Sequence, residues 1–317
     1  MMSERTTTDL RTLHHSALLY ATPGEFADVA GQYVERARGA GEVPVVIAGG
    51  EATEALFDRL GTAGTEGVEF IDAAAWFTGP IEALGAFHEH ARNDWWPRGP
   101  VRLLAEPVWT GRADRDVREW LRHEAVLNVV LAGTPTRLLC AYATSTLPTT
   151  LLRDAARTHP LLTDAGGTRD SPGYVEPARF SAECDAEPLV PPPLTAARKV
   201  FASGSLPMLR EFLAYQALRH GLRDSYGFVL AVNEVATHVI REGGGHGAVW
   251  LWREGAELVC DVTDPNASPR DPFLGYFPPH AHRHAESRMW AVRRLCTLVE
   301  IRATRPGTRT RLRVRVP

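Results

Sequence analysis

The chain has 317 residues, of which 44% are hydrophobic and 23% are charged, and its formal net charge is −3. This composition is typical of a soluble globular protein with room for about two domains. The small net charge gives no electrostatic reason to expect nucleic acid or an anionic membrane as a partner. The four cysteines are far apart and form no Cys-x-x-Cys, so we expect neither a redox pair nor a metal site.

The N-terminal residues lack the apolar core of a signal peptide, and no run of about 18 uncharged apolar residues is present anywhere. These two absences predict a cytoplasmic protein with no membrane partner.

The N-terminal half alternates helical and strand patterns. Thr22-Pro23-Gly24-Glu25 is a capping box with proline at the first helical position, and it predicts a helix to about Arg38. The apolar run Val43–Ala48 predicts a buried strand. Further strands are expected over residues 68–72, 101–106 and 136–142, and helices over 51–60, 80–93, 114–131 and 148–158. Such alternation predicts βαβ units around a parallel sheet.

Ligands of parallel sheets collect beyond the carboxyl ends of the strands, which here singles out Gly49, Gly50, Asp72, Glu106 and Tyr142. No G-x-x-x-x-G-K-[ST] follows the strand at Val43–Ala48, so a phosphate-binding loop is not predicted. For Gly49-Gly50 a simple turn is favoured over a ligand contact. For Glu106 an exposed loop carboxylate is favoured over a buried acid.

Four short segments carry a resemblance to a known family. They are His15-Ser-Ala-Leu-Leu-Tyr20, a long helix with Glu124 and Asn128, Leu139-Cys140-Ala-Tyr142, and Thr158-His159-Pro160 followed by Tyr174. Together they resemble the MEDS sensory domain over about residues 12–178. The resemblance implies a RecA-like α/β fold without a working P-loop, and sensing of a small molecule or a partner. The sensory candidates are His15, Tyr20, Glu106, Glu124, Cys140, Tyr142, His159 and Tyr174. For His15 taken alone, a histidine satisfied by the backbone is favoured over a ligand-binding one.

Glycine and proline are frequent over Asp164–Pro193, which ends in Pro191-Pro192-Pro193. This composition is typical of a linker. We therefore expect a sensory domain over residues 1–180, a proline-rich linker over 181–193 and a second domain over 194–317.

The second domain is predicted from a helix between Ser205 and about His220, followed by an amphipathic helix over Val229–Glu242. Strands are expected over residues 248–253 and 257–264. A Pro/His-rich loop, a helix ending near Cys296 and two more strands follow. Glu234 and His238 lie four residues apart and share one helical face, for which a solvated polar face of a core helix is the simplest interpretation.

This order of elements resembles the α/β-sandwich of the GHKL (Bergerat-type) ATPases, specifically the anti-sigma-factor serine kinases. In that family a Glu-x-x-x-Asn supplies a catalytic base and a magnesium ligand. Here Glu234 is present but His238 replaces the asparagine. Asp264 stands where the family binds adenine, but Asp264-Pro265-Asn266-Ala267-Ser268 lacks both glycines of Asp-x-Gly-x-Gly. The second glycine box aligns with Glu286-Ser287-Arg288-Met289.

These replacements disfavour nucleotide binding. The glycines let the backbone approach phosphate, and Glu286 would place a negative charge there, which Arg288 offsets only in part. Imidazole is a poorer magnesium ligand than an amide oxygen. We therefore expect no cofactor and a vestigial nucleotide site at His238, Asp264, Asn266, Glu286 and Arg288. Glu234 would be catalytic, with ATP and Mg²⁺, only if the kinase were active.

Two further patterns lie in this half. His280, His282 and His284 fall where the family has its ATP lid, and exposed loop histidines are favoured there over a metal site. The final strand alternates Arg309, Arg311, Arg313 and Arg315 with less polar residues. For these arginines a solvated face is favoured over a surface for an acidic protein partner.

The predicted function is that of a cytoplasmic signalling or transcription regulator. It would bind a sigma factor or an anti-sigma-factor antagonist under control of the sensory domain, without direct nucleic-acid contact. One alternative is an active ATP-dependent protein-serine kinase acting on such an antagonist, and another is a small-molecule receptor acting through the sensory half. A zinc-dependent hydrolase is disfavoured because no His-Glu-x-x-His is present. The sequence leaves open whether the chain forms a homodimer.

Overall fold

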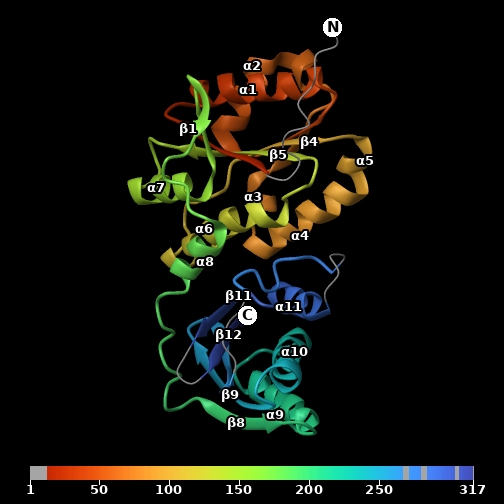
Figure 1. Cartoon of the computed structure of the whole chain (residues 1–317), viewed down its shortest axis with the longest axis vertical. Coiled ribbons are helices and arrows are strands. Elements are labelled where there is room, and N and C mark those ends of the chain that lie inside the picture. The colour runs from red at the N-terminus through yellow and green to blue at the C-terminus, as the bar shows by residue number, and fades with distance from the viewer. Residues whose placement is uncertain (1–12, 267–270, 280–283, 304–306, 317) are drawn as a thin grey trace. The chain divides into compact units, whose positions relative to one another are not determined.

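The computed structural model describes residues 13–266, 271–279, 284–303 and 307–316 (Figure 1). The chain forms two compact units, Met1–Ser181 and Ala182–Pro317, called here the N-terminal and the C-terminal unit. The N-terminal unit contains a seven-stranded, mostly parallel sheet, and the C-terminal unit a five-stranded antiparallel sheet. Both units combine helices with a sheet, which confirms the α/β class.

The central sheet of the N-terminal unit has the order β3-β2-β4-β5-β1-β6-β7. All neighbours are parallel except β6 and β7, which form an antiparallel hairpin. The strands are β1 (His14–Tyr20), β2 (Val43–Ala48), β3 (Glu69–Asp72), β4 (Val101–Ala105), β5 (Thr136–Ala143), β6 (Leu161–Asp164) and β7 (Gly167–Asp170).

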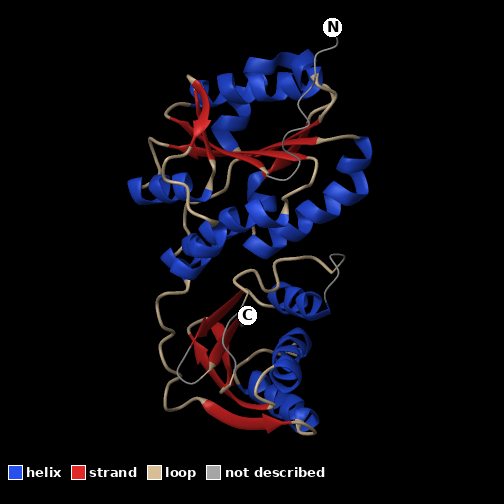
Figure 2. Ribbon diagram, viewed as in Figure 1, coloured by secondary structure: helices blue, strands red, loops and turns tan. Residues whose placement is uncertain are grey.

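Helices cover both faces of this sheet (Figure 2). On one face α1 (Pro23–Gly39) and α2 (Gly50–Thr65) pack on apolar residues of β1, β2, β4 and β5. On the other lie α3 (Ala73–Trp76), α4 (Pro80–His90) and α6 (Asp114–Val130). A π-helical turn, Ala91–Trp95, links α4 to α5 (Trp96–Arg98). The remaining helices of the unit are α7 (Thr149–Thr158) and α8 (Pro177–Cys184), the latter reaching the unit boundary.

Two predictions for the N-terminal half that rest on neighbouring residues are confirmed. The predicted strand at residues 43–48 is β2, and the predicted capping box opens α1. Thr22 Oγ1 accepts the N–H of Glu25 at 3.2 Å, while the Glu25 carboxylate accepts the N–H of Ala21 at 2.7 Å. The helix expected over residues 51–60 is too short, because α2 continues to Thr65 beyond a kink at Gly61, where φ is +62°.

Two parts of the sequence were assigned too little structure. The segment His14–Tyr20 was not predicted as a strand, although β1 lies in the sheet interior between β5 and β6. The segment from Asp164 to Pro193 was interpreted as linker, but its first part forms the β6–β7 hairpin and α8. Ala165-Gly166 is the hairpin turn, and Gly167, the first residue of β7, adopts a φ of +120°, so these glycines mark a hairpin rather than a flexible linker.

The C-terminal unit packs helices on one face of its sheet, whose order is β11-β12-β10-β9-β8. The helices are α9 (Leu206–Arg219), α10 (Tyr226–Glu242) and α11 (His284–Leu295). The strands are β8 (Ala197–Ala202), β9 (His246–Glu254), β10 (Glu257–Asp264), β11 (Leu298–Ala303) and β12 (Thr308–Arg315). The apolar face of α10 predicted from its periodicity joins α9 and the sheet in a single core.

The opposite face of this sheet corrects the prediction of solvated arginines for Arg311 and Arg313, whereas Arg315 is exposed as predicted. Arg311 and Arg313 on β12 are buried. The Arg311 guanidinium donates to both carboxylate oxygens of Asp261 on β10, at 2.7 and 2.9 Å, and also to the carbonyl of Val190 at 2.6 Å. Arg302 on β11 donates to the carbonyl of Glu187 at 3.1 Å. The alternation of arginine with less polar residues correctly predicted a strand. The arginine side of that strand is not solvated around Arg311, because the segment before β8 contacts this face of the sheet through the carbonyls of Glu187 and Val190.

Candidate functional site

Four side chains capable of binding a metal or a polar ligand meet in the interior of the N-terminal unit. They are His15 on β1, Cys140 on β5, Glu124 on α6 and His159 just after α7, and we call them the four-residue cluster. All four are at most 1% exposed, and their ligand-type atoms lie within 4.8 Å of one another. Each comes from a different element, so no spacing motif in the sequence marks the cluster.

The parallel pairing of β1 with β5 places two of these side chains on one face of the sheet. Ala17 pairs with Cys140, so the two share a face, and His15 lies two residues before Ala17 on that same face. Tyr142, two residues after Cys140, is buried there too, with its ring 5.5 Å from that of His159. The strand alternation therefore directs all of these groups toward the helices α6 and α7.

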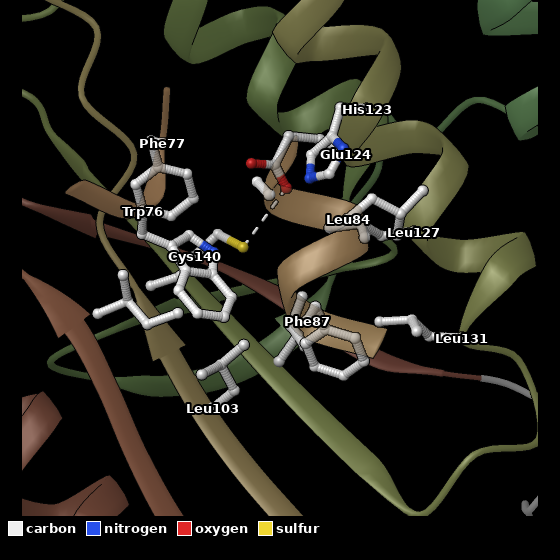
Figure 3. Close-up of a pocket in the computed structure, with 14 residues that line it drawn as sticks. Trp76, Phe77, Leu84, Phe87, Leu103, His123, Glu124, Leu127, Leu131 and Cys140 are labelled. Atoms are coloured by element: carbon white, nitrogen blue, oxygen red, sulfur yellow. Dashed lines mark hydrogen bonds between the residues drawn. The ribbon is translucent and has the colours of Figure 1, made fainter. Parts of the chain in front are cut away.

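The Glu124 carboxylate is the centre of the cluster. Its Oε2 atom lies 3.4 Å from His15 Nε2, 3.4 Å from His159 Nε2 and 3.4 Å from Cys140 Sγ. His15 Nε2 is also 3.4 Å from Cys140 Sγ. Figure 3 shows the contact between Glu124 and Cys140 from the side of the neighbouring cavity.

Hydrogen bonds on the far side of each imidazole identify the nitrogen that carries the proton. The Asn128 amide nitrogen donates to the carbonyl of Thr158 at 2.8 Å, so its oxygen faces His15 Nδ1 at 3.1 Å. His159 Nδ1 lies 2.8 Å from the carbonyl of Ala155, which can only accept. In both rings Nδ1 therefore carries a proton, and Nε2 faces Glu124.

The interior position sets the charge of each group. Burial, reinforced by His159, lowers the pKa of His15 to about 4, so its imidazole is neutral at neutral pH. Burial alone would raise the pKa of Glu124, but its contacts with His15 and His159 hold that pKa well below its usual range. Burial and then the charge of Glu124 raise the pKa of the Cys140 thiol well above its usual range. The cluster thus holds a carboxylate, a protonated thiol and two imidazoles whose Nε2 atoms face the carboxylate.

A cavity of about 30 Å³ adjoins the cluster, between the sheet and helices α3, α4 and α6. Figure 3 shows apolar side chains such as Trp76, Phe87 and Leu103 around it, and Glu124 and Cys140 at its polar end. His123 also lines the cavity, and the sequence analysis did not single it out. Its only sequence signal is its position beside Glu124. A cavity of this size has room for one or two water-sized groups.

The other sensory candidates lie elsewhere. Tyr20 donates a hydrogen bond to Glu106, which follows β4. Glu106 is half-buried, and burial raises its pKa although the bond from Tyr20 opposes this, so the favoured interpretation as an exposed loop carboxylate is wrong. Tyr174 follows β7, is half-buried, and its backbone N–H donates to the carbonyl of Ser171 at 3.2 Å.

The expected vestigial nucleotide site has its polar groups engaged within the protein. His238 Nδ1 lies 3.4 Å from Glu242, whose carboxylate also accepts from Arg288 at 3.3 Å. The buried Asp264 accepts the backbone N–H groups of Gly244 and Asn266, each at 3.0 Å. Glu234 is half-buried on α10.

The remaining residues singled out in this half are only partly within the described structure. His284 and Glu286 belong to α11, but their side chains are outside the described residues, as are His280 and His282 entirely.

Comparison with known families finds a match within the N-terminal unit. Residues 14–160 match the family described as "MEDS: MEthanogen/methylotroph, DcmR Sensory domain". The match confirms the resemblance over residues 14–160, which include all four residues of the cluster, and Tyr174 lies outside it. It indicates a sensory, regulatory role for the chain. No curated protein matches the chain. Among the described residues, none of the helices is long and apolar enough to cross a membrane.

Proposed function

We propose that the chain is a sensory regulator: the N-terminal unit receives a small ligand beside Glu124 and Cys140, and the C-terminal unit responds by protein–protein contact. The partner would be a sigma factor or an anti-sigma-factor antagonist. The observation that carries the proposal is an ionised carboxylate at the end of an apolar cavity, inside a domain that matches a sensory family.

A purely structural role explains Glu124 poorly. Its contacts with the other cluster residues are to two histidines and a cysteine, and His15 is neutral at neutral pH. A buried charge costs several kcal/mol unless it is paired and hydrogen-bonded, and apolar residues of similar volume often stabilise such a site at least as well. A ligand that engages the carboxylate would explain why a carboxylate is kept there.

The cavity limits the ligand to a small molecule. A volume of about 30 Å³ with mostly apolar walls suits a molecule of few non-hydrogen atoms that carries a single polar group. The polar group would face Glu124 and Cys140, and the apolar part would contact side chains such as Trp76 and Phe87.

For the C-terminal unit, two observations support protein contact without phosphoryl transfer. His238 lies beside Glu242, and Asp264 Oδ1 accepts two backbone N–H groups, so both side chains are engaged within the protein. The apolar side chains of Met208, Tyr215 and Leu218 are exposed on one side of α9. Exposed apolar groups gathered on one helix side are typical of interaction surfaces.

Calorimetric titration of the full chain with ATP, with and without Mg²⁺, tests the second half of the proposal. We expect no heat of binding up to millimolar ATP. Saturable binding, accompanied by stabilisation of about 2.7 kcal/mol at 100 times the dissociation constant, would contradict it. Glu234 would then become the candidate catalytic base of an active protein-serine kinase.

Thermal melts of the full chain in a series from methanol to 1-butanol test the sensory half. A receptor cavity predicts stabilisation that peaks at one chain length and disappears in Ala105→Val, which fills the cavity wall. Ala143→Val, on β5 outside the cavity lining, is the matched control and should keep the response. Destabilisation that simply grows with alcohol length would contradict a specific cavity. Sedimentation of the chain alone would show whether a second copy occupies the exposed side of α9.

A further inference from the structure

We propose that the four-residue cluster is a binding site for a divalent transition-metal ion of the zinc type, with His15, Cys140, Glu124 and His159 as its ligands. This inference rests on the proposed function in one respect, since it assigns a chemical identity to the polar end of the ligand cavity. The sequence analysis expected no metal, because the four donors come from four elements and form no spacing motif.

The distances between donor atoms fit the size of such an ion. His15 Nε2, Cys140 Sγ and Glu124 Oε2 form a triangle with sides of 3.4 Å. Its centre lies about 2.0 Å from each atom, close to the Zn–N and Zn–O distances of about 2.0–2.2 Å and somewhat short of the Zn–S distance of about 2.3 Å. An ion displaced slightly from this plane has longer bonds to all three. His159 Nε2, 3.4 Å from Glu124 Oε2, supplies the fourth ligand of a tetrahedron.

The groups behind the two imidazoles are those that support metal-binding histidines. Such a histidine donates its other N–H to a carbonyl or carboxylate, which fixes the ring and leaves a lone pair for the metal. His15 has Asn128 Oδ1 in that role, at 3.1 Å, and His159 has the carbonyl of Ala155, at 2.8 Å. His159 Nε2 is fully buried and, among the described residues, has no hydrogen-bond partner.

Charge is balanced when the ion binds. Glu124 contributes one negative charge, and Cys140 contributes a second once its thiol releases its proton to solvent. The two negative charges match a divalent cation, so the loaded site is neutral within an apolar interior.

The arrangement also suggests how a metal would report on the cavity. Glu124 and Cys140 line the cavity, whereas His15 and His159 do not. A small ligand with a donor atom would therefore reach the ion by displacing Glu124 or Cys140, while His15 and His159 stay bound. Sites with four protein ligands are closed, and exchange of one of them opens a position for an external ligand.

The test uses the full chain, stripped with a chelator and reloaded with Zn²⁺ or Co²⁺. Elemental analysis should find stoichiometric zinc, and the cobalt form should show the near-ultraviolet sulfur-to-cobalt absorption of a thiolate ligand. Cys140→Ser should lose that band, and His159→Gln should lose stoichiometric zinc. His88→Gln is the matched control, since His88 also has a buried, unpartnered nitrogen but lies on α4 outside the cluster.

Asn128→Ala keeps the inference testable if a ligand variant fails to fold. Because Asn128 orients His15 without touching the ion, zinc affinity should fall by about 10–100-fold, while circular dichroism stays that of the wild type. Only trace zinc in the wild type, no thiolate band, or binding that no cluster variant weakens would overturn the inference in favour of a metal-free hydrogen-bonded network. The alcohol melts separate the two proposals, since a cavity response without metal leaves the sensory function standing. Stoichiometric metal without a cavity response removes that function and keeps the metal site.

Discussion

Each unit of the chain buries a group of ionisable side chains, and the two groups differ in how their charges are matched. In the C-terminal unit, Asp261 is fully buried and receives two hydrogen bonds from Arg311, with Arg309 3.6 Å away. In the N-terminal unit, Glu124 is equally buried but faces two imidazole nitrogens and a thiol. The first group contains its own counter-charges, whereas the second places a carboxylate beside groups that carry no permanent positive charge.

This difference separates a structural polar group from a ligand site. The buried arginines join β10, β11 and β12 to the segment before β8 through Asp261 and the carbonyls of Glu187 and Val190. In that network the Asp261 carboxylate is neutralised by arginines of the same sheet. In the four-residue cluster the carboxylate faces imidazole nitrogens beside a cavity, so a proton or a cation is needed to match its charge.

The largest expected effect is on the stability of the C-terminal unit. Asp261→Ala leaves Arg311 buried without its carboxylate and should lower the free energy of unfolding by about 3–5 kcal/mol. Hydrogen exchange of the β10 amides measures this locally. The double variant Asp261→Leu/Arg311→Met should recover most of the loss, because it removes both charges together. A loss below about 1 kcal/mol for Asp261→Ala would place this pair with weak surface ion pairs.

The second effect distinguishes the groups by their response to metal. At a free zinc concentration 100 times the dissociation constant, the wild type should gain about 2.7 kcal/mol of stability, and Glu124→Gln should gain much less. Asp261→Asn should lose stability equally with and without zinc. Thermal melts in chelator and in zinc measure both. Equal zinc responses in wild type and Glu124→Gln would contradict the assignment of Glu124 as a ligand.

A third acid, Glu106, shows how burial acts on a carboxyl group whose hydrogen bond comes from a tyrosine. Burial raises the pKa of Glu106, so the folded state binds its proton more tightly than the unfolded state does. Its contribution to stability is therefore greatest below the unfolded pKa of about 4.3 and is lost as pH rises through the folded value. Tyr20→Phe removes a bond to the ionised form and should raise that pKa further. NMR titration of the Glu106 carboxyl carbon measures the shift, and a fall would contradict it.

The sequence predicts an element well when the interactions that form it join residues close together in the chain. The α1 cap, β2 and the apolar face of α10 were predicted because their signals lie within a few residues. The strand β1 was missed, since its partners β5 and β6 are more than 100 residues away and its own sequence lacks clear alternation. The arginines of β12 were placed in solvent because no local pattern shows which segment covers a sheet.

The candidate site shows the same limit. His15, Glu124, Cys140 and His159 were singled out by resemblance, yet spacing alone favoured a histidine satisfied by the backbone for His15. The hydrogen bond of His15 Nδ1 goes to the side chain of Asn128, 113 residues away, and not to the backbone. Only the folded arrangement shows that both Nε2 atoms point at one carboxylate.

The smallest expected effect on stability is at an exposed group of ion pairs around Arg59, which serves as a control for the effect of burial. Arg59 on α2 lies 3.3 Å from Asp28 and 3.2 Å from Glu35, distances similar to those of the buried groups, but the side chain is 36% exposed. Solvent screens such pairs, so Arg59→Ala should change the free energy of unfolding by at most about 1 kcal/mol. The change should shrink further in high salt, whereas the loss in Asp261→Ala should hardly depend on salt. Urea unfolding at low and high ionic strength measures both, and equal losses would show that pairing geometry rather than burial sets the energy.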